Sequence, residues 1–282
     1  MFFSSLTSLV SQAAHPFFIL FAWLLATFFA LVPNYVFAIA LLTIAVMIVV
    51  YPITLRGTRS MMKMQLLAPE LKRIQTRFKS KPSASVAERQ ESRQRLNEEM
   101  MALYQENGVS PTGGCLTMFL QFPIFIILYD TIKGLIHTVT QHGHVIPLPR
   151  YVSSSSKLYH AVAHGHGALQ SFGINLADSV RTTGLSFGTR LPLIALILVA
   201  IALQYIQMKQ LSGRNPTAAN PQMQKIQRLF PIIFAIIYIA IPAAVNVYFI
   251  VSSLFRVLQQ EYMYRRDPHI RASMARLREA PG

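Results

Sequence analysis

Charged residues are scarce in this sequence of 282 residues. They make up 13% of it, against 52% hydrophobic residues, whereas a globular domain carries about a quarter charged residues. Acidic residues are the scarcer sign, with 11 Asp and Glu against 26 Lys and Arg, and the net charge is +15. A water-soluble core does not account for this balance. The composition instead predicts an integral membrane protein whose Lys and Arg mark the cytoplasmic loops.

Cysteine is almost absent, and the N-terminal part has no basic residue. The single Cys115 excludes an internal disulfide framework and a cysteine metal cluster. No Lys or Arg precedes Arg56, so the basic region that opens a secretory signal is missing. We therefore expect the first apolar stretch to be retained in the protein.

Long apolar runs are what the sequence does contain. A helix that crosses about 30 Å of hydrocarbon needs roughly 20 apolar residues, and three segments meet this length: Tyr35–Leu55, Leu116–Ile136 and Leu191–Met208. A fourth stretch, Leu229–Phe255, fits either one long helix or two short helices broken near Pro242.

The distribution of basic residues decides between one helix and two. Residues 56–114 carry eleven Lys or Arg, 209–228 carry four and 256–282 carry six, whereas 140–189 carry three. The first three segments are predicted to be cytoplasmic and the last one external. An even number of spans must then lie between residues 228 and 256, so we predict two helices that turn at Ile241 and Pro242. The result is five spans, with the N-terminus outside and the C-terminus in the cytoplasm.

The segment Pro16–Val32 fits two positions. It is apolar on all sides, lacks the polar face of an interfacial helix, and joins the first span through Pro33 and Asn34. It is either a sixth span or a helix in the outer interface, and we favour the interface because of the resemblance described below.

The predicted fold is an all-α polytopic membrane protein with five core transmembrane helices. Its segments are an N-terminal apolar or interfacial helix (1–33), core span 1 (34–56), a cytoplasmic helical hairpin (57–114), core span 2 (115–138), an outer loop (139–189), core span 3 (190–210), a cytoplasmic loop (211–225), core span 4 (226–241), core span 5 (242–262) and a basic cytoplasmic tail (263–282).

Two apolar stripes between the first two spans predict the helical hairpin. They consist of Met64, Leu67, Leu71, Ile74 and Phe78 in the first arm and Leu96, Met100 and Leu103 in the second. Pro69 predicts a kink or the start of regular helix, and Ser85 and Glu88 have the spacing of a capping box. A solvated hairpin is one interpretation. The methionines favour a surface that binds apolar clients, namely Met61, Met62, Met100 and Met101.

The tail contains Arg265, Arg266 and further arginines with few acids. Three interpretations fit this cluster: positive-inside anchoring, binding to anionic lipids and contact with the phosphates of ribosomal RNA. We predict no specific DNA binding.

Several strings, taken in order and at their spacing, resemble the YidC-type insertases of bacteria, mitochondria and thylakoids. They are Tyr51–Thr54, Ser60–Pro69, Asn97–Tyr104, Gly113–Leu116, Gln121–Phe125, Phe230–Pro231, Pro242–Tyr248 and Gln259–Gln260. The resemblance implies a polar groove that opens to the cytoplasm and to lipid and is closed outside. It also implies a membrane insertase and chaperone of the bacterial cell membrane that is not an enzyme and needs no cofactor. Its partners would be newly made membrane proteins, the ribosome and the Sec translocon.

Carried over position by position, the resemblance also predicts which residues line the groove. They are Thr43, Met47, Gln121, Phe122, Phe125, Gln204 or Gln207, Tyr248 and Phe249. Family members usually have an arginine where this chain has Met47, and that arginine is thought to attract acidic client segments. Arg56, Arg59 and Lys133 are the candidates to replace it. Gln residues in apolar spans also fit plain hydrogen bonding between helices.

Asp130 and Lys133 are spaced to pair along one helix face. Ionisable residues within a span are functional candidates. At the outer end of a span, such a pair also fits side chains that reach toward water.

Other classes of protein fit less well. A transporter or channel would show internal repeats or interrupted helices in matching halves, and the motifs of serine and zinc proteases are absent. A chaperone that assembles clients after another machine has inserted them stays open. The histidines of the outer loop predict a flexible polar loop rather than a metal site, because they lack regular spacing and paired carboxylates. They are His142, His144, His160, His164 and His166.

Overall fold

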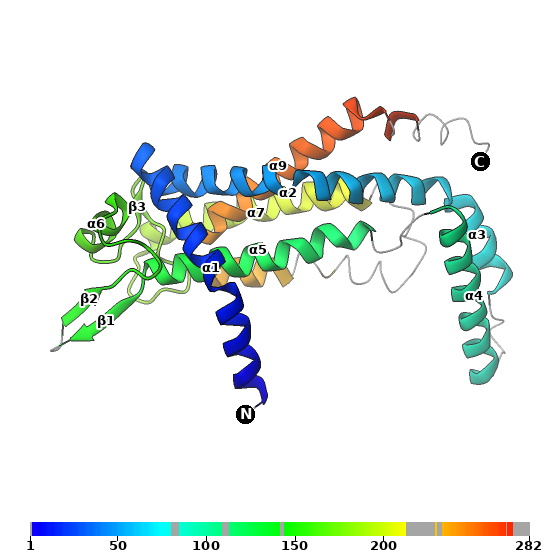
Figure 1. Cartoon of the computed structure of the whole chain (residues 1–282), viewed down its shortest axis with the longest axis horizontal. Helices are drawn as coiled ribbons and strands as arrows, with labels where there is room; N and C mark the ends of the chain where they lie inside the picture. Colours follow the sequence, from blue (N-terminus) through cyan, green and yellow to red (C-terminus); the bar gives the residue numbers. More distant parts are fainter. Residues whose placement is uncertain are drawn as a thin grey trace. The chain divides into compact units, whose positions relative to one another are not determined.

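The structure is a computed structural model that describes residues 2–79, 85–108, 113–141, 144–212, 229, 233–268 and 270–272. Its elements follow the chain as α1 (Phe2–Leu31), α2 (Tyr35–Leu66), α3 (Ala68–Arg77), α4 (Val86–Glu106), α5 (Gly113–Leu135), β1 (Thr138–Gln141), β2 (His144–Pro147), α6 (Lys157–His164), β3 (Gln170–Ser171), β4 (Ile174–Asn175), α7 (Phe187–Ser212) and α9 (Ala243–Arg266) (Figure 1). A helical stretch over residues 233–240 precedes α9.

The described chain is mostly helical. Two of its helical segments, Tyr35–Ser60 and Phe187–Gln210, are long and apolar enough to cross a membrane, and His15–Leu31 forms a shorter apolar helix. The prediction of five core spans is therefore supported only in its coarser form, a helical protein with membrane-spanning segments.

Two helix boundaries differ from the simple division into spans. α2 continues to Leu66, well past Arg56, and α9 continues to Arg266. α9 begins directly after Ile241 and Pro242, where the proline lacks the backbone N–H that a continuing helix would need.

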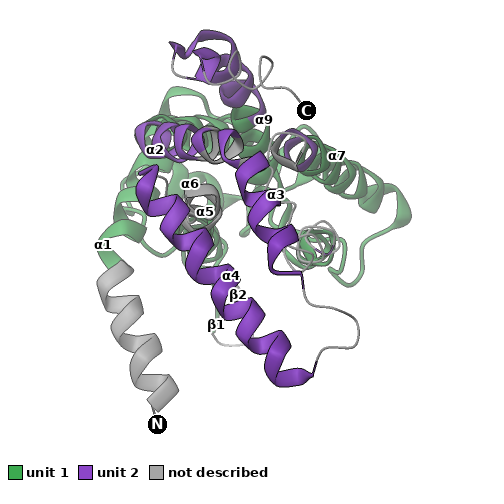
Figure 2. Ribbon diagram, turned by 90° about the vertical axis from the view of Figure 1, so that its right-hand side faces the viewer, with its two compact units in different colours: residues 1–49, 120–206, 230–256 green, residues 50–119, 207–229, 257–282 purple. Residues whose placement is uncertain are grey.

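The chain divides into two compact units, which Figure 2 colours separately. Unit 1 comprises residues 1–49, 120–206 and 230–256, and unit 2 comprises residues 50–119, 207–229 and 257–282.

In unit 1, α1 buries one face. Phe18, Ala22, Leu25 and Phe29 are all at most 5% exposed, and their spacing of three and four residues places them on one side of the helix. Trp23 lies on another side and is 60% exposed.

The outer loop contains regular structure that the sequence did not predict. β1 pairs antiparallel with β2, β3 pairs antiparallel with β4, and α6 begins at an N-cap in which Ser156 Oγ accepts from the Tyr159 amide. Tyr151 has a φ of 66° and packs against α1, with its ring centroid 5.5 Å from that of Phe18. The segment expected to be a polar loop thus contains strands and a helix and belongs to unit 1.

This loop also satisfies the starts of two helices. The Leu176 carbonyl accepts from the Ala244 amide at 2.9 Å and the Asp178 carbonyl from the Ala243 amide at 2.8 Å, while Ser171 Oγ accepts from the Tyr35 amide at 3.2 Å. Helix starts otherwise leave several amides unpaired. The outer loop therefore covers the first turns of α2 and α9.

In unit 2, α3 and α4 form the predicted hairpin. Leu67, Leu71 and Tyr104 make a small buried core, against which Met100 and Leu103 pack. The capping box is confirmed, because Ser85 Oγ accepts from the Glu88 amide and Glu88 accepts from the Ser85 amide. Pro69 lies in the first turn of α3, which confirms that it begins the regular helix.

Candidate functional site

A polar cluster joins α5 and α9 inside unit 1. Gln121 Nε2 on α5 donates to the Tyr248 hydroxyl at 2.5 Å, and Gln121 Oε1 accepts from Arg256 Nη2. Tyr248 and Arg256 are separated by eight residues on α9, so two turns place them on one face of the helix. We call Gln121, Tyr248 and Arg256 the Arg256 cluster.

Within the described residues, Arg256 is a cation without an anion. Its side chain is largely shielded from solvent, its Nε is buried with no acceptor, and no carboxylate pairs with it in the described part of the chain. Its guanidinium donates instead to the Gln121 amide, which in turn donates to the Tyr248 hydroxyl. Transfer of an ion out of water costs several kcal/mol unless partners compensate it, so this position is one at which an incoming anionic or carbonyl group would be stabilised.

Further unsatisfied polar groups lie on α9 and on the helical stretch that precedes it. The Tyr238 hydroxyl is buried without a partner among the described residues. Asn246 Nδ2 donates to the Tyr238 carbonyl at 3.1 Å, but its Oδ1 is buried and unpaired in this part of the chain. Buried polar groups normally find partners, so this cluster of exceptions marks unit 1 as a polar site within an apolar bundle.

An aromatic wall stands beside the cluster. The Phe249 ring lies 5.4 Å from Phe125, 4.9 Å from Tyr238 and 5.2 Å from Tyr248, measured between ring centroids. Phe249 and Tyr248 are 4% and 1% exposed, so these rings pack the core and position the hydroxyl of Tyr248.

The other residues predicted for the groove lie in different settings. Thr43 is buried, and its hydroxyl donates to the Ile39 carbonyl of its own helix at 2.7 Å. Met47 is 3% exposed and Phe122 is 46% exposed. Gln204 on α7 lies 3.5 Å from the Ser253 hydroxyl of α9. Gln207 belongs to unit 2, and its Oε1 is buried without a partner among the described residues.

The three basic residues that the sequence offered in place of an arginine at Met47 are not part of the cluster. Arg56 is exposed, Arg59 pairs with Asp267, and the Lys133 ammonium lies over the Tyr129 ring at 5.2 Å. Asp130 and Lys133 form no ion pair within the described residues. Arg256 was missed because its charge was counted with the basic tail. Its two-turn spacing from Tyr248 could have revealed it.

The structure describes the side chains of some, but not all, of the predicted client-binding residues of the hairpin and tail. Met100 packs against the hairpin core, whereas Met101 is 45% exposed. The side chains of Met61 and Met62 are not among those that the structure describes. Arg265 and Arg266 are exposed, and Arg265 pairs with Glu261 at 2.7 Å.

Two of the outer-loop histidines, His160 and His164, stack on each other. The rings of His160 and His164 are 6.3 Å apart. Across the described residues, no group of three or more His, Cys, Asp or Glu could hold a metal ion. His142 lies outside those residues.

A family model described as 60Kd inner membrane protein matches residues 27–270. The chain is 30% identical over 244 residues to a membrane protein insertase YidC from Mannheimia succiniciproducens, covering 86% of this chain and 36% of that protein. It is 30% identical over 242 residues to membrane protein insertase YidC 2 from Bacillus anthracis, covering 86% of this chain and 76% of that protein. The chain thus spans about a third of one relative and three quarters of the other.

A solved structure shares the fold. It is the crystal structure of an active YidC insertase with its first transmembrane domain resolved, and it superposes with a TM-score of 0.54 over 90% of this chain and 47% of that chain. The sequence identity is 20%, so this likeness concerns the fold alone.

Proposed function

Because this chain belongs to the 60Kd inner membrane protein family, we propose that it is a membrane protein insertase that moves newly made membrane proteins into the lipid bilayer. The relatives named above carry that function in their names. The proposed setting is the cytoplasmic membrane of a bacterium, with five core spans, the N-terminus outside and the C-terminus inside.

The energetics of insertion define what such a protein must do. A client helix gains about 0.3–0.6 kcal/mol for each central Leu, Ile, Phe or Val, whereas a charge at its centre costs about 2.5–3.5 kcal/mol. The apolar part of the client therefore inserts favourably, and the barrier lies in moving its polar flank across. The proposed task is to lower that transfer barrier, with no covalent chemistry.

The Arg256 cluster is the observation that carries this proposal. A guanidinium that no carboxylate of the described residues pairs with, held by the Gln121 amide that also contacts the Tyr248 hydroxyl, offers hydrogen-bond donors to a carboxylate or backbone carbonyl that leaves water. In this proposal Arg256 supplies the positive charge that the family usually places at the position of Met47. Gln121 holds the guanidinium, and Gln204 extends the polar lining toward α7.

The proposal is tested with the purified full-length chain in liposomes. The substrate is a single-span client whose short translocated tail carries either a pair of Asp or a matched pair of Asn, and insertion is scored by protease protection. Insertion above that in empty liposomes is expected for both tails. The enhancement should be about tenfold larger for the acidic tail, because a hydrogen bond to a charged group contributes about 1.5–3 kcal/mol.

Two results would contradict parts of this proposal. Background insertion of both tails by folded protein would reject autonomous insertion and favour an assembly chaperone. Equal enhancement of both tails would keep the insertase but remove the role given to Arg256.

A further inference from the structure

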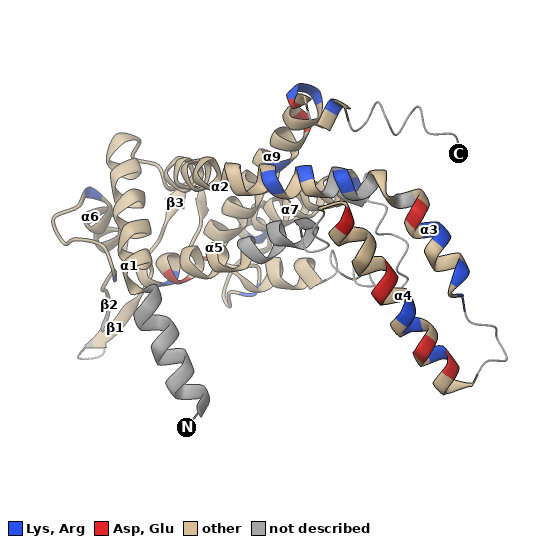
Figure 3. Cartoon of the chain, turned by 45° about the vertical axis from the view of Figure 1, so that its right-hand side comes forward, with Lys and Arg blue, Asp and Glu red and all other residues tan. Residues whose placement is uncertain are grey.

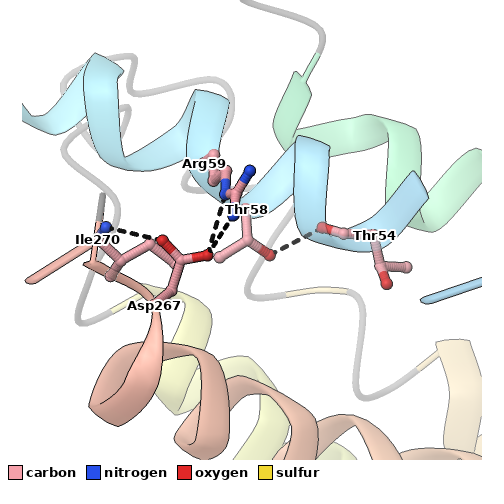
Figure 4. Close-up of polar contacts among 5 residues, drawn as sticks. All are labelled: Thr54, Thr58, Arg59, Asp267 and Ile270. Carbon is pink, nitrogen blue, oxygen red and sulfur yellow. Dashed lines mark hydrogen bonds and ion pairs between the residues drawn. The ribbon is translucent and has the colours of Figure 1, made fainter. Parts of the chain in front are cut away.

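A second polar cluster lies within unit 2, where α2 meets the segment that follows α9 (Figure 4). Arg59 Nε and Nη2 donate to Asp267 Oδ2 at 3.0 and 2.7 Å. The other carboxylate oxygen, Asp267 Oδ1, accepts from the Ile270 amide at 3.2 Å. The side chain of Asp267 is 7% exposed and that of Arg59 is 40% exposed. We call this arrangement the Arg59–Asp267 clasp.

Neighbouring contacts hold the same two segments together. Gln259 Nε2 on α9 donates to Thr54 Oγ1 on α2 at 2.6 Å. Met263 and Ile270 form a buried apolar cluster, against which three further side chains pack: Tyr51, Leu55 and Tyr264. The end of α9 and the turn after it are thus fixed to α2 by an ion pair, a hydrogen bond and an apolar contact.

Basic side chains flank the clasp on both segments. Arg56, Arg59 and Lys63 follow one another at steps of three and four on α2, which places them on one face of the helix. The Arg271 amide donates to the Asp267 carbonyl at 3.0 Å, so Arg271 lies one turn beyond Asp267. Arg266 directly precedes Asp267 in the sequence. Figure 3 shows Lys and Arg in blue on this part of α2 and at the end of α9.

Four of these side chains are available to a ligand. Each is exposed, and each lacks an ion-pair partner among the residues described. They are Arg56, Lys63, Arg266 and Arg271. We call them the basic surface.

We propose that the basic surface binds the headgroups of anionic phospholipids and that the clasp assembles it from two segments far apart in the sequence. Arg56 lies in the last turns of the apolar segment Tyr35–Ser60, and Lys63 lies about one turn past the end of that segment. This is the depth at which a spanning helix leaves hydrocarbon and meets headgroups. A Lys or Arg near an anionic membrane surface strengthens binding about fivefold. The inference does not rest on insertase activity.

The decisive variant is Asp267→Asn. It removes the ion pair and raises the net positive charge by one, while Asn still accepts a hydrogen bond from the Ile270 amide as an N-cap. If only total charge mattered, this variant would bind anionic lipid at least as well as the original chain. If the clasp assembles the surface, the variant should bind more weakly by about fivefold or more, the contribution of at least one basic side chain.

The assay titrates the detergent-solubilised full-length chain with phosphatidylglycerol, with phosphatidylcholine as the neutral lipid, and counts retained lipid by native mass spectrometry. Glu91→Gln is the matched control, because it adds the same charge at an exposed pair with Arg95 on α4 and leaves the clasp intact. Its affinity should not fall. Circular dichroism and gel filtration check that each variant is folded.

A second variant, Arg56→Gln with Lys63→Gln, keeps the clasp and removes half of the basic surface. It should lower the affinity for phosphatidylglycerol while leaving phosphatidylcholine unaffected. Unchanged or tighter binding by Asp267→Asn would overturn the role of the clasp. Equal retention of the two lipids by the original chain, together with salt-dependent binding of a short RNA, would overturn the lipid assignment and make the basic surface an RNA contact.

Discussion

Arg256 and Arg59 are held by side chains in opposite ways. Arg59 meets the carboxylate of Asp267 through two donors, whereas Arg256 meets the neutral amide of Gln121 and has a buried Nε with no partner in the described part of the chain. A paired cation is electrostatically satisfied and serves to join segments. An unpaired cation in an apolar bundle can still be stabilised by an anion that binds to it. The partner of an arginine, more than its burial, thus separates a structural role from a binding role.

Among the substitutions considered, Arg256→Gln should have the largest effect. Insertion of the acidic-tailed client should fall about tenfold, the value of a lost hydrogen bond to a charged group, and the neutral-tailed client should lose less. Arg59→Gln is the matched control and should insert both clients at nearly the original rate. Similar losses from the two variants in the liposome assay would mean that the arginines do not differ in role.

Gly134→Ala tests whether the unpaired groups of unit 1 reflect loose packing. An added Cβ would lie 2.8 Å from two ring carbons of Tyr151, and such overpacking costs about 1–3 kcal/mol. The variant should therefore unfold at a lower temperature in detergent. Gly188→Ala is the control, because its nearest neighbour is the Ser186 hydroxyl at 4.0 Å. Equal melting temperatures would indicate a loosely packed unit.

Asp267→Asn tests the structural role of the ion pair between Arg59 and Asp267. Removal of this partly exposed ion pair should cost about 1–2 kcal/mol, between the values for surface and buried pairs. The loss should be local, so amide hydrogen exchange should accelerate in residues 263–271 and not in α3 or α4. Uniform acceleration would show that the clasp stabilises all of unit 2.

The smallest effect is expected at the start of α4, where every hydrogen bond of the capping box is made. Hydrogen bonds from the Ser85 amide and hydroxyl hold the pKa of Glu88 below its ordinary value of 4.5. A lowered pKa stabilises the folded state above the unfolded pKa, and this contribution is lost as the pH falls through the folded pKa. The protection of the amides of residues 85–89, relative to their intrinsic exchange rate at each pH, should therefore fall in acid. In Glu88→Gln this pH dependence should vanish.

Local signals in the sequence predicted local structure well. The capping box at Ser85 and Glu88 and the helix start at Pro69 depend on neighbours within one turn, and both are present. The family itself was also recognisable from ordered strings. These features need no knowledge of distant contacts.

Features that depend on distant contacts were not predictable. The strands of the outer loop are too short to give a periodic signal in the sequence. The outer loop also makes contacts with α1, α2 and α9, and the sequence does not show these contacts. Arg256 was grouped with the tail because charge counting follows the sequence and ignores helix faces. The clasp joins Arg59 to a carboxylate that lies 208 positions away, which no spacing rule connects.

The capped start of α9 has an electrical consequence. The carbonyls of Leu176 and Asp178 accept hydrogen bonds from its first amides, and Asp178 is itself an acid, so the partial positive charge of about half a unit at this helix start is partly compensated. Arg256 follows in the middle of the helix, and Arg265 and Arg266 lie at its end. The one acid of α9, Glu261, is engaged by Arg265. Among the described residues, the basic charge of α9 that no acid pairs with is therefore that of Arg256 in the middle of the helix and Arg266 at its end.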